Sequence, residues 1–197
     1  MDFSLLTDAL SSKSYGKIAD ICDELMLKGA AEMEGVPFEE EWPFAIHLLA
    51  HIYVNDINSA RYLWKSIPAA VKERQPEVVA AWRIGQRLWT RDYAAVHEAI
   101  RAFDWSQQIQ PLVVAFSEVY TKRMFQLLLS AYSTIGIQDT ALFLGMNEDD
   151  ATNYVVQQGW VVDPDSRMLT SLKHYQTSTE SRLIRHPLIG ENSINLT

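Results

Sequence analysis

Two histidines four residues apart, His47 and His51 in the segment HLLAH, have a spacing suited to metal chemistry. This spacing puts both imidazoles on one face of a helix, as in the zinc-binding motif of metalloproteases. That motif needs a glutamate directly after the first histidine to act as the base, and Leu48 stands there. Because apolar residues flank both histidines, we interpret them as packing residues of a buried helix. We therefore expect no metal ligands and no cofactor.

Other catalytic motifs are also missing from the sequence. The eight glycines form neither a phosphate-binding loop nor a dinucleotide fingerprint, and no Gly-x-Ser-x-Gly segment occurs. The single cysteine, Cys22, lies between Ile21 and Leu25 in an apolar pattern, which indicates a buried, inert thiol. It would become a nucleophile only if the fold brought a histidine next to it. The sequence predicts that this protein is not an enzyme.

The composition is that of a soluble protein with a substantial core. The chain has 197 residues, of which 48% are hydrophobic, and these suffice for one or two domains. The net charge of -8 disfavours binding to nucleic acid or to an anionic membrane. The start, MDFSLLTDALSSKSY, lacks a basic signal region, and no apolar run approaches the ~18 residues of a membrane span. We expect a soluble intracellular protein.

Apolar residues recur at helical spacing through most of the chain. The pattern predicts a first short helix from Phe3 to Leu10, then helices at 16–30, 44–54, 58–67, 77–92, 93–103 and about 111–132, with a loop at 32–43 and a short element between Pro68 and Pro76. Neighbouring helices are too amphipathic to stand alone, so we expect them to stack as antiparallel pairs. The predicted fold class is mainly α: a short helical-repeat, TPR-like stack over 1–110.

Residues 135–163 have the layout of a winged helix-turn-helix. Ile137, Ala141 and Leu144 form one short apolar face, and Gly145 follows as a helix end. Asn147 is a good N-cap for a second helix. A strand at 160–162, a turn at 163–166 and a returning strand at 167–172 predict a two-stranded wing. We expect the linking helix and the winged helix to occupy 111–173, and 174–197 to be a divergent tail.

The charge of this segment argues against DNA binding. It contains five acidic residues and no lysine or arginine. The second helix would enter the major groove by its start, where Glu148, Asp149 and Asp150 stand. These carboxylates suit the helix dipole but repel phosphate. The sequence predicts a module that binds protein and no nucleic acid.

Two surfaces are candidates for protein contact. Trp160, Val161 and Val162 form an apolar strand whose free edge another chain can extend, although Trp160 could equally be a core residue. Arg83, Arg87 and Arg91, spaced by four residues, could form a basic stripe for an acidic partner. The alternative for the arginines is an ordinary solvated helix face.

Helical repeats that lead into an acidic winged helix resemble the PCI domain. This domain is shared by the proteasome lid, the COP-nine signalosome and the translation initiation factor three complex. Residues 123–163 carry its pattern: Tyr132 and Ile135 end the entry helix, Ile137 and Ala141 open the next, Leu144 closes it, and Val155 and Val156 precede the wing. Longer stretches, including WPFAIHLLAHIYVNDINSARYLWKSIP, resemble a small signalosome PCI subunit, particularly that of plants.

The resemblance implies a noncatalytic scaffold subunit of the complex that removes a ubiquitin-like modifier from cullins. In that complex a different, metal-binding subunit is the isopeptidase, and its His-x-His pair does not occur here. The implied partners are other PCI subunits in a hetero-oligomer, joined through the edges of their winged helices. The tail at 174–197 departs from the longer amphipathic helix expected of the family. The alternative function is a stand-alone helical-repeat adaptor for one protein or peptide.

Overall fold

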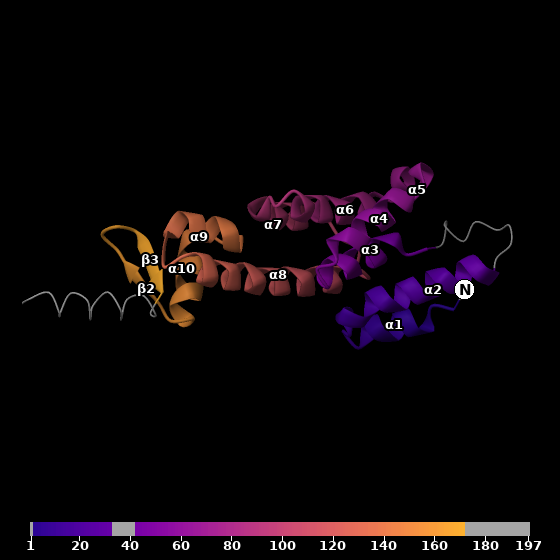
Figure 1. Cartoon of the computed structure of the whole chain (residues 1–197), viewed down its shortest axis with the longest axis horizontal. Coiled ribbons are helices and arrows are strands. Elements are labelled where there is room, and N and C mark those ends of the chain that lie inside the picture. Colours follow the sequence, from indigo (N-terminus) through magenta and orange to yellow (C-terminus); the bar gives the residue numbers. More distant parts are fainter. Residues whose placement is uncertain (1, 33–41, 172–197) are drawn as a thin grey trace, which may run out of the picture. The chain divides into compact units, whose positions relative to one another are not determined.

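The computed structural model describes residues 2–32 and 42–171, which form two compact units that meet between Met124 and Phe125. The first unit contains α1 (Ser4–Ser11), a 3₁₀ turn (Tyr15–Lys17), α2 (Ile18–Glu32), α3 (Phe44–Tyr53), α4 (Ile57–Ser66), α5 (Ala69–Arg74), α6 (Pro76–Trp89), α7 (Tyr93–Arg101) and the first part of α8 (Gln110–Ala131) (Figure 1). The second unit contains the end of α8, β1 (Thr134–Gly136), α9 (Ile137–Leu144), α10 (Glu148–Gln157), β2 (Trp160–Asp163) and β3 (Met168–Ser171). The fold class predicted from the sequence, mainly α with a winged-helix end, is confirmed.

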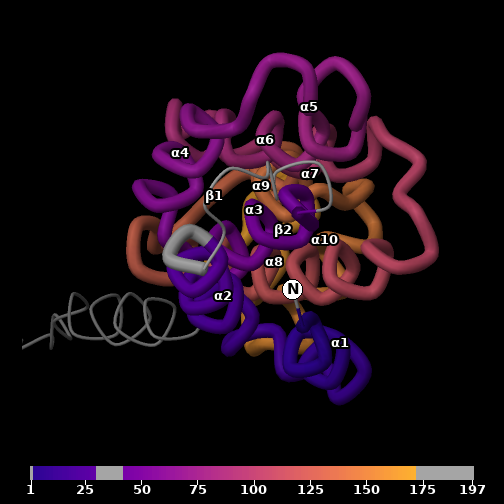
Figure 2. The backbone as a smooth tube through the Cα atoms, turned by 90° about the vertical axis from the view of Figure 1, so that its right-hand side faces the viewer, coloured from indigo at the N-terminus to yellow at the C-terminus, as the bar shows by residue number. Residues whose placement is uncertain are grey.

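The centre of the first unit is α3. Every residue from Phe44 to Ile52 is buried, because α3 packs between α2 on one side and α4 and α6 on the other (Figure 1, Figure 2). Gly85 of α6 permits a close crossing, since a β carbon there would lie 3.2 Å from Ile52 Cδ1 and 3.1 Å from the Trp82 ring. The helix pairs therefore share one continuous core, as a repeat stack requires.

Local signals mark the starts of two helices in this unit. Pro76 occupies the first turn of α6, where its missing N–H costs nothing. Asp56 caps α4 by accepting a hydrogen bond from the Ser59 N–H at 3.0 Å. The predicted end of α6 is wrong: the helix ends at Trp89, three residues before the predicted end at 92. Arg91 adopts a left-handed φ of 58° in the turn that follows, so this residue lies outside the helix.

The caps predicted for the helix-turn-helix are confirmed. Gly145 ends α9 with a φ of 68°, which costs glycine little. Asn147 caps α10: its Oδ1 accepts from the Asp150 N–H at 2.8 Å, and its Nδ2 donates to Asp150 Oδ2 at 2.7 Å. Ala151 is buried where α9 and α10 cross.

The wing has three strands, and the prediction of two was wrong. Ile135, expected at the end of the entry helix, belongs to β1 and lies opposite Leu169 of β3. The entry helix α8 ends at Ala131. The β-branched pair Thr134-Ile135 favours an extended chain, and β3 supplies the partner that stabilises it. The sheet has the order β1-β3-β2 and is antiparallel throughout.

Residues 33–41, most of the loop predicted at 32–43, and the predicted tail at 174–197 lie outside the described residues. The predicted limits of the domains stay predictions. The unit boundary after Met124 falls within α8.

Candidate protein-interaction surfaces

The strand β2 forms one edge of the three-stranded sheet. Within residues 42–171 it pairs with β3 alone, Val161 opposite Thr170 and Val162 opposite Leu169. On the other side of β3, the Ser171 N–H donates to the Ser133 carbonyl and the Ile137 N–H donates to the Arg167 carbonyl. The odd-numbered residues of β3 thus direct their backbone groups toward β1.

The alternation of an antiparallel ladder then fixes the orientation of β2. Because the even-numbered residues of β3 face β2, Thr170 and Met168 form hydrogen-bonded pairs with Val161 and Asp163. The backbone groups of Trp160 and Val162 must therefore point away from β3, to the open side of the sheet. This edge can accept a strand from another chain.

The side chain of Trp160 belongs to the core of the second unit. It is 4% exposed, and its ring lies 6.2 Å from that of Phe125, which in turn makes an edge contact with Tyr154. Its indole Nε1 is buried and has no hydrogen-bond partner among residues 2–32 and 42–171. The backbone of Trp160, but not its ring, is thus positioned for contact, whereas Val161 and Val162 are half-buried.

The start of α10 is acidic, as the sequence indicated. Glu148, Asp149 and Asp150 occupy its first turn and are exposed or half-buried. The structure adds Arg167, whose guanidinium donates to the Glu148 carboxylate across the unit. One of the three charges is therefore compensated, and the other two lie at the positive end of the helix dipole.

The predicted arginine stripe is shorter than its spacing suggested. Arg83 and Arg87 are exposed on α6, whereas Arg91 lies in the turn beyond it. Arg87 donates to Asp92 Oδ2 at 3.0 Å, a surface ion pair of small stabilising value. Arg83 and Arg87 also line a shallow hollow of about 290 Å³ against α7. Their role as a contact surface stays a prediction.

The two histidines of α3 belong to a buried polar cluster. His47 and His51 are 1% and 4% exposed, and their Nε2 atoms lie 3.0 Å apart. His47 Nε2 lies 2.8 Å from Asp23 Oδ1 of α2, and the Trp42 indole donates to His47 Nδ1 at 3.3 Å. Burial, with the neighbouring His51, lowers the pKa of His47 to about 4. The sequence analysis missed Asp23, which lies 24 residues before His47.

Cys22 is fully buried, as predicted for an inert thiol. Burial raises its pKa to about 12, so the thiolate is scarce at neutral pH. Cys22 is not part of the cluster formed by Asp23, His47 and His51.

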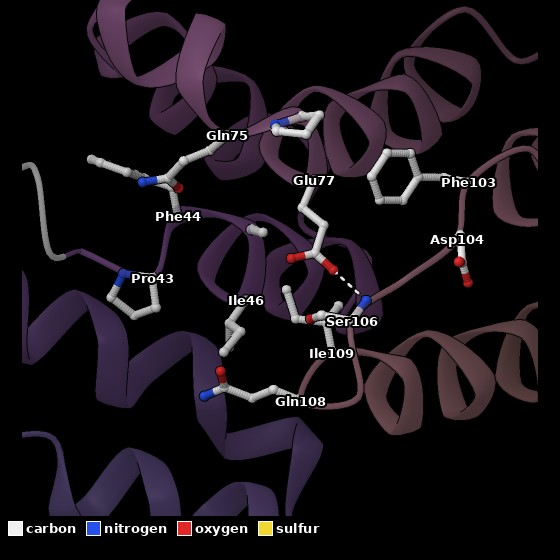
Figure 3. A pocket seen from close by; sticks show the side chains of 12 residues that line it. Pro43, Phe44, Ile46, Gln75, Glu77, Phe103, Asp104, Ser106, Gln108 and Ile109 are labelled. Carbon is white, nitrogen blue, oxygen red and sulfur yellow. Dashed lines mark hydrogen bonds between the residues drawn. The ribbon is translucent and has the colours of Figure 1, made fainter.

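A pocket of about 440 Å³ lies in the first unit, where α3 and α6 begin and the chain approaches α8. Glu77 lies at its centre and accepts a hydrogen bond from the Ser106 N–H at 2.7 Å (Figure 3). Apolar walls come from Phe44, Ile46 and Phe103.

None of the helices within the described ranges is long and apolar enough to cross a membrane.

Known proteins resemble this chain over most of its length. It is 60% identical over 189 residues to the COP9 signalosome complex subunit 8 of Arabidopsis thaliana, which covers 94% of this chain and 95% of that protein. The subunits of the same name from Danio rerio and Xenopus tropicalis are 37% and 34% identical, covering 79% and 81% of this chain and 83% and 80% of those proteins. A model of the CSN8/PSMD8/EIF3K family matches residues 39–180. The chain therefore belongs to the CSN8/PSMD8/EIF3K family.

Proposed function

We propose that this chain is a noncatalytic assembly subunit of a COP9 signalosome. The observation that carries this proposal is the 60% identity to the Arabidopsis thaliana subunit across nearly the whole of both chains. The family resemblance implies that such a complex removes a ubiquitin-like modifier from cullins. In this function the chain holds other subunits in place, in cytoplasm and nucleus, and has no hydrolase or isopeptidase activity of its own.

We assign the contact with other PCI subunits to the free edge of β2. The Val162 N–H and carbonyl are directed away from β3 by the ladder. A partner strand that pairs there would satisfy them and extend the sheet. The acidic start of α10 lies in the same unit and favours a protein partner over a nucleic acid.

The alternation along β2 permits a sharp experiment. Val162→Pro removes an N–H that β3 does not use, whereas Val161→Pro removes one that pairs with Thr170. We expect Val162→Pro to keep the thermal unfolding curve of the wild type and to lose co-purification with the other PCI subunits. We expect Val161→Pro to destabilise the wing itself.

Val162→Ala is the matched control for the side chain. It keeps the backbone N–H, so co-purification should persist if main-chain pairing holds the partner. If Val162→Pro folds normally and still co-purifies with all subunits, the assignment of this edge is wrong. If the wild-type chain recovers no signalosome subunits from plant tissue, the proposed function itself is wrong.

A further inference from the structure

Three potential metal ligands from two helices converge at one point in the first unit. His51 Nε2 lies 3.0 Å from His47 Nε2 and 3.3 Å from Asp23 Oδ1, and the third side of the triangle, from His47 Nε2 to Asp23 Oδ1, is 2.8 Å. The imidazole rings are stacked, with centroids 4.8 Å apart and planes inclined by 29°. Both Nε2 atoms therefore face the same point.

The triangle is close to the face of a zinc coordination tetrahedron. Zinc bonds to histidine nitrogen and carboxylate oxygen are about 2.0–2.1 Å long, which puts neighbouring ligand atoms about 3.3 Å apart. The edge from His51 to Asp23 already has this length, and the edge between the two imidazoles, 3.0 Å, is about 0.3 Å short of it. The edge from Asp23 to His47, 2.8 Å, needs about half an ångström more. Asp23 can provide this movement, because its side chain is 52% exposed whereas both imidazoles are held in the core.

Because Asp23 is partly exposed, a metal ion can reach this point from solvent. The two histidines are themselves buried, at 1% and 4% exposure. An ion at the triangle would thus have three protein ligands and one position open to water. Two imidazoles, a carboxylate and water form a ligand set that suits zinc.

We propose that Asp23, His47 and His51 form a zinc site that joins α2 to α3. This proposal replaces the expectation from the sequence that the two histidines serve packing alone. The missing glutamate after His47 removes a protease base but not the ligands, and the third ligand comes from another helix. The proposal is independent of the proposed function, because an ion at this point would link α2 to α3 within the first unit.

Trp42 gives the site a specific signature. The Trp42 indole N–H donates to His47 Nδ1, which requires an unprotonated Nδ1 and places the ring proton on Nε2. If zinc binds Nε2, this proton must move to Nδ1. The Nδ1–H and the indole N–H are then two donors that point at each other and cannot form a hydrogen bond. Binding must therefore break this long hydrogen bond and change the surroundings of Trp42, whereas zinc bound elsewhere would not.

The test is a zinc titration of the full chain, prepared without a histidine tag and freed of metal by a chelator. We expect saturable binding of one zinc ion per chain, a higher melting temperature with zinc, and a shift of the Trp42 indole N–H resonance. Asp23→Ala and His51→Gln should each weaken binding by more than about tenfold, since even outer-shell partners of a metal ligand contribute this much.

Asp20→Ala is the matched control, because Asp20 is an exposed carboxylate one turn earlier on α2. It should bind zinc like the wild type. Asp23→Ala changes an exposed position and should fold, so the test does not depend on the buried histidines. Absence of saturable binding, equal weakening by Asp20→Ala and Asp23→Ala, or a Trp42 resonance that does not move would each overturn the proposal.

Discussion

Gly85 of α6 lies against Ile52 of α3 so closely that even a β carbon would make an unusually tight contact. A β carbon at Gly85 would approach Ile52 Cδ1 to 3.2 Å, and the ring of Trp82 on its own helix to 3.1 Å. The two helices at the centre of the first unit therefore owe their separation to this glycine.

Gly85→Val should destabilise the protein by about 2 kcal/mol or more. The two added methyl groups force Ile52 and Trp82 off their rotamers in a packed core. Urea unfolding followed by circular dichroism measures the change. Gln86→Val, which adds the same β-branched residue at an exposed position of α6, should cost much less. A loss in Gly85→Val no larger than that in Gln86→Val would contradict the role of the crossing, because helix propensity alone favours valine over glycine.

Asn147→Ala should lower the free energy of unfolding by about 1 kcal/mol, the usual value of an N-cap. The mutation removes the oxygen that accepts from the Asp150 N–H at 2.8 Å. Asn153→Ala is the control, because Asn153 is exposed within α10 and alanine favours a helix there. A loss of stability in Asn153→Ala as large as that in Asn147→Ala would contradict the capping role.

Cys22 should resist thiol reagents in the folded protein and react once in urea. Its side chain is fully buried, so a reagent cannot reach the sulfur. Burial also raises its pKa to about 12, so little of the reactive thiolate is present. Ser11→Cys supplies an exposed thiol in α1 as a positive control. Rapid labelling of Cys22 under native conditions, as fast as that of the control thiol, would show that α2 opens readily.

Arg83→Glu should weaken co-purification with the signalosome if this arginine meets an acidic partner. The change leaves the core of α6 intact because Arg83 is exposed. Lys65→Glu, an equal charge change at an exposed position of α4, is the control. If neither variant changes co-purification, Arg83 is part of a solvated face.

Duplex DNA should not bind at physiological salt. The recognition-helix position carries Glu148, Asp149 and Asp150. Within residues 42–171, Arg167 forms an ion pair with Glu148, so its charge is already compensated. Fluorescence anisotropy with a labelled duplex measures binding. Specific submicromolar affinity would show that another surface of the chain recognises DNA.

Features set by neighbouring residues were predictable from the sequence. Gly145 and Asn147 act within one turn of their own positions, so their residue types alone indicate the helix ends. The strand β1 was missed because three residues carry little pattern and their partner Leu169 lies far along the chain. The end of α6 was missed because Arg91 takes a left-handed turn that arginine seldom adopts.

For the candidate sites too, some features were visible in the sequence and others depend on contacts between distant segments. The apolar strand at Val161 and Val162 is visible as a run of β-branched residues, but the direction of each N–H depends on the register with β3. The spacing of His47 and His51 is visible too, whereas Asp23 joins them only because α2 packs on α3. Sequence spacing identifies ligands on one helix and gives no information about a ligand on its neighbour.

The brevity of β2 has a consequence for how tightly the wing can hold a partner. Only Trp160 and Val162 direct backbone groups to the open side, so a docking strand gains at most four hydrogen bonds there. At about 1 kcal/mol net for each bond, pairing contributes roughly 4 kcal/mol, which corresponds to a dissociation constant near 1 mM. A peptide copied from the partner strand should bind this weakly. If this edge docks a partner as proposed, it sets alignment, and lasting retention of the subunit then requires avidity from simultaneous contacts elsewhere on the chain.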